Sequence, residues 1–392
     1  MKLSVPTSWD NSLVEKLKEL NAETKNIHEL YGTMRASVLG GGRPSAILPD
    51  VSFAQVKEHI DFVHSRGFSF NYLVNAPCHG GKEFEPKFRD KMFEYLDWVN
   101  NLNVDIVTLS NPYLVELVRK EYPSLKIKIS SFAYVNSVNI AGYYDQLGAD
   151  RITLGIGLTR RLGKLRKIRE STRADLEVIV NANCIFDCPL TGYHSRLNGH
   201  ESLEQEDGKP PLFVDYPVFK CFQKRLLSPE EMIKSCWIRP EDIRIYEEIG
   251  IEHFKLAGRT FPNEWILRCA EAYSHRKHGG NLLDLLVMSS IPFLASLTGD
   301  KTRLSSIFYV ANQALDGFLD FFKDHDCHGD CEACGYCPGV AKQALQVVGD
   351  VDAFKTKLEE VLSKIVSREL TKTDVYAKLC KLPETPIYTR FR

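Results

Sequence analysis

Residues 105–130 read DIVTLSNPYLVELVRKEYPSLKIKIS, an apolar run followed by an amphipathic stretch and a second apolar run. The two runs, Asp105–Leu109 and Lys126–Ser130, are short and rich in β-branched residues, which is typical of buried strands. Between them, Tyr113–Tyr122 places its apolar side chains at helical spacing. A strand, a helix and a second strand in this order predict a βα unit of a parallel sheet.

The same alternation runs from the start of the chain to about residue 277. It predicts eight strands, at Leu3–Pro6, Ile27–Tyr31, Ser69–Val74, Asp105–Leu109, Lys126–Ser130, Arg151–Leu154, Leu176–Asn181 and His253–Leu256. It also predicts helices at Ser52–Arg66, Pro86–Asn101, Tyr113–Tyr122, Val138–Leu147, Arg161–Arg173 and Arg239–Ile249. Eight βα units favour a TIM-barrel-like (β/α)8 domain, and an open doubly wound sheet remains the alternative.

Composition excludes several classes of protein. The chain has 392 residues, 44% of them hydrophobic, with 50 basic and 51 acidic side chains. Such a balance indicates neither a general affinity for nucleic acid nor one for an anionic membrane. No run approaches the roughly 20 apolar residues of a membrane span, so we expect a soluble, cytoplasmic protein. Its 11 cysteines are unusual for a disulfide scaffold of this length, which favours metal binding or catalysis.

The chain divides into a predicted barrel domain, 1–277, and a helical C-terminal region, 278–392. Three helices without strands are expected in the second part, at Asn281–Leu297, Leu304–Phe322 and Val351–Val366. Within the first, residues 183–238 form a long insertion after the seventh strand, with little helical periodicity. Barrels of this type carry their active sites at the carboxyl ends of the strands, so the insertion is the expected functional region.

Four cysteines lie in or beside this insertion, and thiolates are the ligands that zinc and iron–sulfur clusters prefer. They are Cys184, Cys188, Cys221 and Cys236. Structural zinc sites usually combine two short Cys-x2-Cys pairs, which this set lacks, so an iron–sulfur cluster is favoured over zinc. The alternative for Cys221 is that it is simply a small buried apolar residue.

A second set of four cysteines occupies a short segment of the C-terminal region, 327–337. Its members are Cys327, Cys331, Cys334 and Cys337. The first three have the spacing of a radical S-adenosylmethionine cluster, but they follow the barrel instead of its first strand. A fourth thiolate would close the site, which indicates a structural or electron-relaying role. The spacing does not decide between zinc and a second iron–sulfur cluster for this site.

The segment Ile251-Glu-His-Phe-Lys-Leu-Ala-Gly-Arg259, preceded by Cys236 and by Asn181-Ala-Asn-Cys184, resembles the peptidase U32 family. This family is also described as collagenase-like or YhbU/UbiU-type proteins. The resemblance covers about residues 1–277. It implies a barrel-like domain that binds a [4Fe-4S] cluster through four cysteines, carried over here to Cys184, Cys188, Cys221 and Cys236. It also implies oxygen-independent hydroxylation, which members perform in quinone biosynthesis or on RNA.

Four polar residues are candidates for catalysis beside such a cluster. His194 and His200 follow the first two cysteines, and histidine titrates near neutral pH, so either can serve as general acid or base. Lys255 and Arg259 surround the end of the eighth strand, where a buried cation is costly unless it binds a carboxylate or another anion. For each residue an ordinary structural role is the alternative.

Two further segments have weaker signals. The run Gly40-Gly-Gly-Arg43 lacks the spacing of a phosphate-binding loop and predicts a flexible lid. The basic stretch Arg160–Arg169 predicts a solvated helix face, which is also the best surface for RNA.

Three functions are compatible with these patterns. The first is an iron–sulfur enzyme that performs a redox modification, such as oxygen-independent hydroxylation, on a small molecule, peptide or RNA. The second is a metal-dependent peptidase, although neither His-Glu-x-x-His nor Gly-x-Ser-x-Gly occurs in the sequence. The third is a non-catalytic protein that carries electrons to a partner. A paralogue of the same family or an electron donor is the expected protein partner.

Overall fold

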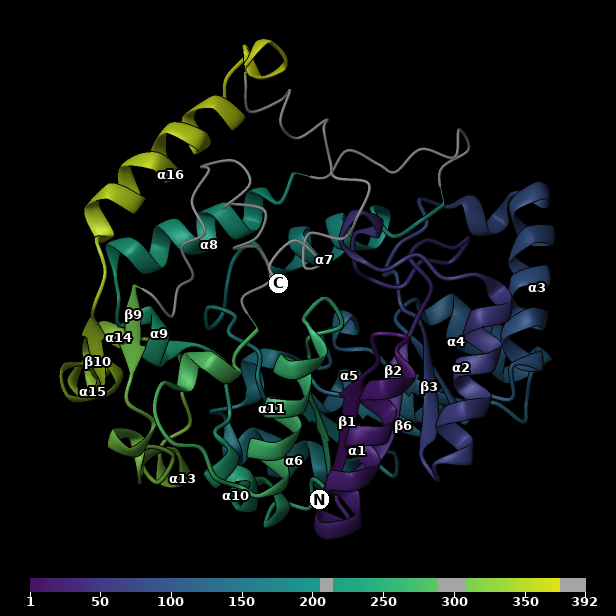
Figure 1. Ribbon diagram of the computed structural model, residues 1–392, viewed down its shortest axis with the longest axis horizontal. Helices are drawn as coiled ribbons and strands as arrows, with labels where there is room; N and C mark the ends of the chain where they lie inside the picture. Colours follow the sequence, from purple (N-terminus) through teal and green to yellow (C-terminus); the bar gives the residue numbers. More distant parts are fainter. Residues whose placement is uncertain (205–213, 288–306, 374–392) are drawn as a thin grey trace.

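The computed structural model describes residues 1–204, 214–287 and 307–373. Eight parallel strands close into a barrel in chain order, because β8 pairs back with β1 (Figure 1). The strands are β1 Lys2–Pro6, β2 Ile27–Gly32, β3 Ser69–Val74, β4 Ile106–Leu109, β5 Lys126–Ile129, β6 Arg151–Thr153, β7 Asp175–Ile179 and β8 His253–Lys255. All eight predicted strands are present, so the barrel prediction is confirmed and the open sheet is excluded.

Helices surround the barrel in the order that a (β/α)8 fold requires. They are α1 Asn11–Thr24, α2 Phe53–Ser65, α3 Pro86–Asn101, α4 Pro112–Glu121, α5 Val138–Gln146, α6 Leu162–Ser171, α10 Ile243–Glu247 and α11 Asn263–Ser274. The helix predicted at Arg239–Ile249 is shorter than expected, since Pro240–Asp242 forms a 3-10 turn before α10. The other predicted helices lie where the sequence places them.

Helix α4 illustrates why these segments become helical. The side chain of Asn111 accepts a hydrogen bond from the Tyr113 backbone amide at 3.0 Å, and Pro112 occupies the first turn, where no amide hydrogen is needed. Its buried face consists of Leu114, Val115 and Val118, all fully inaccessible to solvent. Each such side chain stabilises the fold by roughly 1.5–3 kcal/mol, whereas the cap contributes about 1 kcal/mol. Packing against the barrel therefore dominates.

A buried polar layer crosses the inside of the barrel. It is built from Ser4, Glu29, Asn71, Thr108, Lys128, Arg151, Thr153 and Glu177. The Lys128 ammonium lies 2.9 Å from Glu29 and 2.5 Å from Glu177, and Arg151 lies 2.8 Å from Glu29. Two cations thus balance two carboxylates, so this layer is electrically complete without a ligand.

The insertion after β7 is more regular than its sequence predicts. Its described part contains α7 Thr191–His200, α8 Tyr216–Leu227 and α9 Glu231–Lys234. In α8, Val218, Phe222 and Arg225 are buried at helical spacing, and the apolar face of α16, Val351–Ile365, packs beside it (Figure 1). Helix α8 was not predicted from apolar spacing, because its helical pattern is short and one residue of its buried face is an arginine.

The C-terminal region contains strands, which the sequence did not predict. A two-stranded antiparallel sheet pairs β9 Phe308–Val310 with β10 Leu345–Val347. The helix predicted at Leu304–Phe322 is therefore wrong within the described residues: only α13 Phe321–Asp324 is α-helical there. Gly317, with a φ of +78°, breaks the helical path, and β9 gains backbone partners only from a segment distant in sequence.

The remaining C-terminal predictions have mixed outcomes. The helix at Val351–Val366 is confirmed as α16. The described part of the helix predicted at Asn281–Leu297 is a 3-10 turn, Leu282–Leu285, and its remainder lies outside the described residues. The second cysteine set lies on α14 Cys331–Cys334, on α15 Tyr336–Ala344 and just before them.

Candidate functional site

The first cysteine set is positioned by the ends of β7 and β8. Asn181 is fully buried, donates to the carbonyls of Ala257 at 3.0 Å and Leu285 at 3.3 Å, and accepts from the Ala257 amide at 2.7 Å. This side chain ties the segment that follows β7 to the segment that follows β8. Cys184 comes three residues later, at the carboxyl end of the barrel where such folds place their chemistry.

Cys236 is brought next to Cys184 by main-chain pairing. The Cys236 amide donates to the Cys184 carbonyl at 3.0 Å, and the Ile238 amide donates to the Val180 carbonyl at 2.8 Å. Two segments far apart in the insertion therefore run side by side. Cys236 is 1% exposed and, unlike Cys184, does not line the inner cavity.

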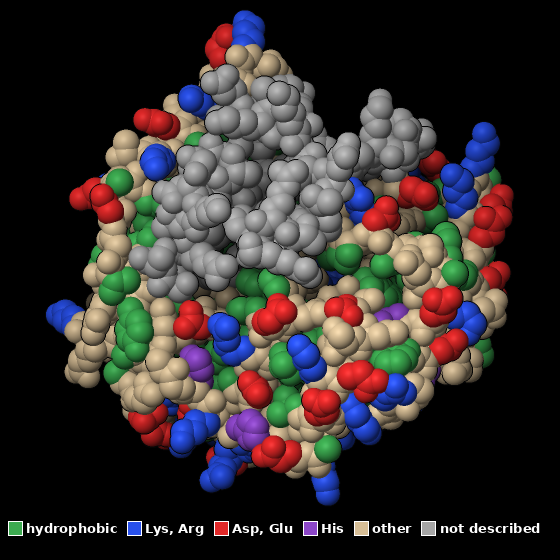
Figure 2. All heavy atoms as spheres, viewed as in Figure 1, with side chains coloured by type: hydrophobic (Ala, Val, Ile, Leu, Met, Phe, Trp, Pro, Cys, Tyr) green, Lys and Arg blue, Asp and Glu red, His purple; other side chains and the backbone are tan. Residues whose placement is uncertain are grey.

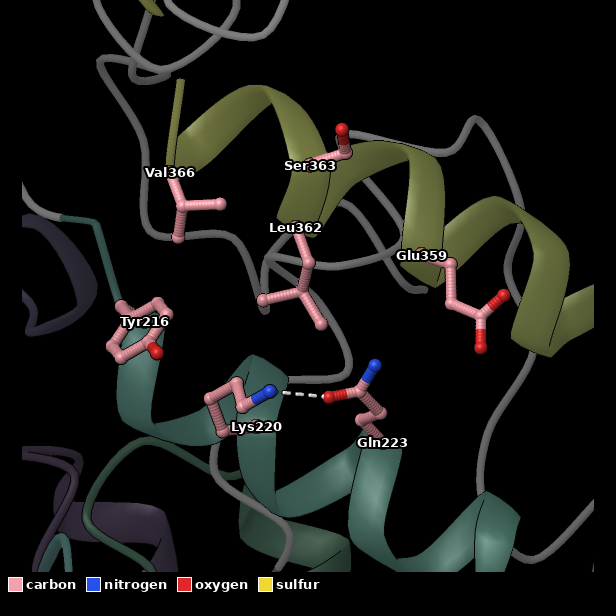
Figure 3. A pocket seen from close by; sticks show the side chains of 7 residues that line it. All are labelled: Tyr216, Lys220, Gln223, Glu359, Leu362, Ser363 and Val366. Carbon is pink, nitrogen blue, oxygen red and sulfur yellow. Dashed lines mark hydrogen bonds between the residues drawn. The ribbon is translucent and has the colours of Figure 1, made fainter. Parts of the chain in front are cut away.

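Helix α8 brings the third element to the site. Asp215 accepts from the Val218 amide at 3.3 Å and starts the helix. Cys221, Phe222 and Arg225 line an inner cavity. The opposite face of α8, with Tyr216, Lys220 and Gln223, borders a groove of about 230 Å³ against α16 (Figure 3). Helical spacing thus separates the cysteine side of α8 from a solvent-facing side on which Lys220 bonds to Gln223.

The inner cavity has a volume of about 160 Å³ and contains three of the four cysteines in its wall. Cys184, Cys188 and Cys221 line it together with Arg43, Tyr134, His194 and apolar side chains, among others. In the described part of the chain, no group of three or more His, Cys, Asp or Glu side chains is arranged as it stands to hold a metal ion. Cys184, Cys188 and Cys221 are thus arranged around the cavity and not around a single position that one metal ion could occupy.

Burial makes Cys184, Cys221 and Cys236 poor acids unless positive charge or a metal compensates. It raises the pKa of Cys184 to about 11, and the neighbouring Cys221 and Cys188 act in the same direction. It also raises the pKa of Cys221 and, more strongly, of Cys236. The positive charge of Arg225 opposes all three shifts. Each of these three thiols is thus close enough to another cysteine of the set for that cysteine to affect its pKa.

Arg225 provides the observation that tests whether a thiolate-bound group fits here. It is fully buried, donates to the Cys221 sulfur and the Asn183 carbonyl, and lies 3.0 Å from the Ser235 hydroxyl. Among the described residues, it forms no ion pair with a carboxylate, and its Nε has no hydrogen-bond partner. A buried guanidinium is costly without an anion, and four thiolates on an iron–sulfur cluster would provide one. The donor set and its surroundings therefore fit such a group.

Arg160 is a second buried arginine of the same kind, placed between the two cysteine sets. It is 1% exposed, bonds to the Ser235 carbonyl at 2.6 Å and stacks 4.7 Å from the rings of Trp237 and Phe318. Its positive charge lowers the pKa of Cys236 and of Cys337 against the larger effect of burial. Arg160 is therefore within electrostatic reach of a cysteine of each set.

The second cysteine set docks onto the barrel through main-chain contacts. The Cys327 amide donates to the Arg160 carbonyl at 3.2 Å, and the Arg161 side chain donates to the Cys327 carbonyl at 2.9 Å. Burial raises the pKa of Cys337, and the other three cysteines of the set add to that shift. The expectation that Arg160–Arg169 forms a solvated face is wrong at its first residue, because the Arg160 side chain is buried against the rings of Trp237 and Phe318.

The four catalytic candidates occupy different places. His194 lines the cavity, and its Nε2 lies 3.2 Å from a carboxylate oxygen of buried Asp215. His200 ends α7, is exposed and does not line the cavity. Lys255 is 9% exposed at the end of β8, where burial and then Lys128 lower its pKa to about 7.

Arg259 shares the barrel mouth with Lys255. It donates to the Gly41 carbonyl at 2.7 Å, and burial lowers its pKa to about 10. The flexible-lid prediction for residues 40–43 is wrong, since Gly40 to Gly42 are buried. A Cβ on Gly42 would approach Asn75 Oδ1 to 2.9 Å, and one on Gly41 would approach Thr33 to 2.2 Å. This loop is packed in place and presents Arg43 to the cavity.

Sequence reasoning missed three arginines of the site: Arg43 as a cavity residue, Arg160 and Arg225. For Arg225 a signal existed, because it follows Cys221 by one helical turn and shares its face. For Arg160 none existed, since its surroundings come from segments distant in the chain.

The fold and the position of this cavity define a (β/α)8 barrel whose chemistry-bearing side chains gather at the carboxyl end of the strands. The chain belongs to peptidase family U32, whose model matches residues 43–278. It is 31% identical over 340 residues to the uncharacterized protease MJ1657 of Methanocaldococcus jannaschii, covering 85% of this chain and 94% of that protein. The resemblance seen in the sequence is thus confirmed.

More distant relatives have names that refer to a reaction. The chain is 30% identical over 159 residues to tRNA hydroxylation protein P of Haemophilus influenzae, covering 39% of this chain and 32% of that protein. With the Escherichia coli protein of the same name, identity is 23% over 264 residues, covering 55% and 56%. A solved structure described as the U32 peptidase Mk0906 has a TM-score of 0.47 at 21% identity, covering 66% of this chain and 93% of that one.

In the residues that the structure describes, no helix is both long and apolar enough to cross a membrane. Basic and acidic side chains are interspersed over the described part of the face seen in Figure 2.

Proposed function

We propose that this protein is an iron–sulfur enzyme in which Cys184, Cys188, Cys221 and Cys236 hold a [4Fe-4S] cluster at the mouth of the barrel. The observation that carries this proposal is Arg225, a buried guanidinium without a carboxylate partner among the described residues, bonded to the Cys221 sulfur. Its positive charge opposes the effect of burial, which raises the pKa of Cys221, and it would compensate the negative charge of a group bound through thiolates. A cluster of several irons also separates its ligands more widely than a single ion does, which suits cysteines arranged around a cavity.

The reaction that we assign to the site is oxygen-independent hydroxylation, with RNA as the favoured substrate. Support for this comes from the names of the two tRNA hydroxylation relatives. Replacing C–H by C–OH removes two electrons from the substrate, so a co-substrate must supply the oxygen and accept those electrons. When bound, the cluster would supply one-electron chemistry beside the cavity. His194, oriented by Asp215, would hold or move the proton.

A hydrolase is the second candidate, and the His194–Asp215 pair is the observation that favours it. A cysteine peptidase orients its base in this way, but its nucleophile needs a lowered pKa and a hydrogen bond to the histidine. Burial instead raises the pKa of Cys184 and Cys221, and no thiol of the described residues bonds to His194. The redox function therefore accounts for more of the site.

Metal analysis after anaerobic purification tests the cluster. We expect about four irons and four sulfides per chain from this set. Cys236→Ser should lose them, whereas Cys78→Ser, at a cysteine outside both sets, should keep them. Additional zinc or iron that disappears in Cys334→Ser would belong to the second set. A protein that contains only zinc, or Cys236→Ser with unchanged iron, would contradict the proposal.

Activity is tested without oxygen on the iron-loaded protein with unmodified tRNA and a cell extract that supplies the oxygen-donating, electron-accepting co-substrate, followed by mass spectrometry of the nucleosides. A gain of one oxygen that depends on Cys236 supports hydroxylation. Cleavage of a peptide library by the iron-free protein, abolished in His194→Ala, would establish the hydrolase instead.

A further inference from the structure

The barrel mouth contains a group of cations that the fold does not neutralise. The polar layer below is already balanced, with Lys128 and Arg151 against Glu29 and Glu177. Above it lie Lys255, Arg259 and Arg43, and none of them forms an ion pair with a carboxylate of the described residues. Their positive charge is therefore in excess.

Lys255 is the best-defined member of this group. Its side chain is nine-tenths buried, and its ammonium lies 3.9 Å from the centre of the Tyr31 ring. No hydrogen bond joins that ammonium to any described residue, and the Tyr31 hydroxyl already donates to the Leu256 carbonyl at 2.7 Å. A buried ammonium with only an aromatic face as its partner costs stability. Such a cost is typical of a residue kept for binding.

Arg259 points to the same conclusion. Its Nη2 is anchored on the Gly41 carbonyl at 2.7 Å, while its Nη1 is buried and has no hydrogen-bond partner among the described residues. One half of the guanidinium is thus held by the protein, and the other half is available to an acceptor. Arg43 follows directly on the packed glycine loop and lines the cysteine cavity.

We infer that Lys255, Arg259 and Arg43 form an anion-binding subsite that holds the carboxylate or phosphate group of a small-molecule ligand beside the cysteine cavity. Ala257, two residues after Lys255, also lines that cavity, which places the subsite and the cavity next to each other. A backbone phosphate of folded RNA is a poor candidate, because Lys255 is nine-tenths buried. The role of such a ligand in catalysis rests on the proposed function, but its binding does not.

Calorimetry on the purified, iron-loaded protein tests the subsite with three probes that share one aromatic ring: benzoate, phenyl phosphate and neutral benzamide. We expect benzoate or phenyl phosphate to bind and benzamide not to bind, and the preferred anion identifies the group. In Lys255→Met and in Arg259→Met, affinity should fall roughly ten- to a hundredfold, the effect of a lost charged hydrogen bond. Arg66→Met, at an arginine paired with Glu15 on the barrel exterior, is the matched control.

Stability separates this role from a structural one. Lys255→Met should raise the melting temperature while it weakens anion binding, because it removes an uncompensated buried charge. Equal binding of benzamide and benzoate, no binding of either anion, or a lower melting temperature of Lys255→Met would overturn the inference. The inference would also be overturned if Lys255→Met and Arg259→Met bound an RNA oligonucleotide more weakly but bound the small anions as tightly as the unsubstituted protein does. Iron content reports separately on the cluster, so the failure of one proposal is distinguishable from that of the other.

Discussion

Replacing Lys255 by Met should stabilise the protein, and the gain should depend on pH. The pKa of Lys255 falls from 10.5 to about 7 on folding. At about 1.4 kcal/mol for each tenfold change in proton affinity, the protonated side chain costs the folded state roughly 5 kcal/mol. Methionine also loses the attraction to the Tyr31 ring, about 2 kcal/mol at a desolvated site. The expected net gain is therefore about 3 kcal/mol.

The pH dependence follows from the direction of the shift. The folded state binds this proton more weakly than the unfolded state, so the cost is full below about pH 7. It decreases as pH rises from about 7 toward 10.5, where the unfolded side chain also loses its proton. The advantage of Lys255→Met should thus be largest at pH 6 and much smaller at pH 9.

Urea unfolding at pH 6, 7, 8 and 9 measures this difference. Lys57→Met is the control, since Lys57 is exposed on α2 and paired with Asp61, and its effect should be small at every pH. A destabilised Lys255→Met, or a gain that is equal at pH 6 and pH 9, would refute the reasoning.

Two further substitutions probe the charges on either side of this residue. Lys128→Met leaves Glu29 and Glu177 with Arg151 as their remaining cation and should lower the free energy of unfolding by roughly 3–5 kcal/mol, measured in urea; an unchanged value would show that the layer tolerates excess negative charge. Arg225→Leu should accelerate the loss of iron to a chelator, followed by absorbance, whereas Arg166→Leu on the exposed side of α6 should not. Equal rates in the two variants would remove the role assigned to Arg225.

The barrel could be predicted because its signal is local and repeated. Each strand is a short apolar run, and each of the confirmed helices has its own apolar face, as the α4 face of Leu114, Val115 and Val118 illustrates. Apart from α16, the described C-terminal region lacks that property. Phe308–Val310 becomes a strand only because Leu345–Val347 pairs with it, and no window of sequence contains both segments.

The candidate site was predictable to a similar extent. Spacing and residue type identify the cysteines, and Lys255 and Arg259 lie at the end of a recognisable strand. The polar surroundings of these residues were not predictable. Arg160 is buried by rings from Trp237 and Phe318, and residues 41 and 42 of the predicted lid are closely packed against Thr33 and Asn75. Such contacts depend on the closed barrel and leave no trace in the order of the residues.

The distribution of charge connects the two proposals. Arg225 and Arg160 lie buried beside the cysteines, and Arg259 and Lys255 lie in the mouth, yet no carboxylate of the described residues pairs with any of the four. Arg43 is within electrostatic reach of both groups, since its positive charge acts on the pKa of Cys184 and of Arg259. Two anions, one bound through sulfur and one bound by the mouth cations, would repel each other across this short space. The positive charge of Arg43 would reduce that repulsion.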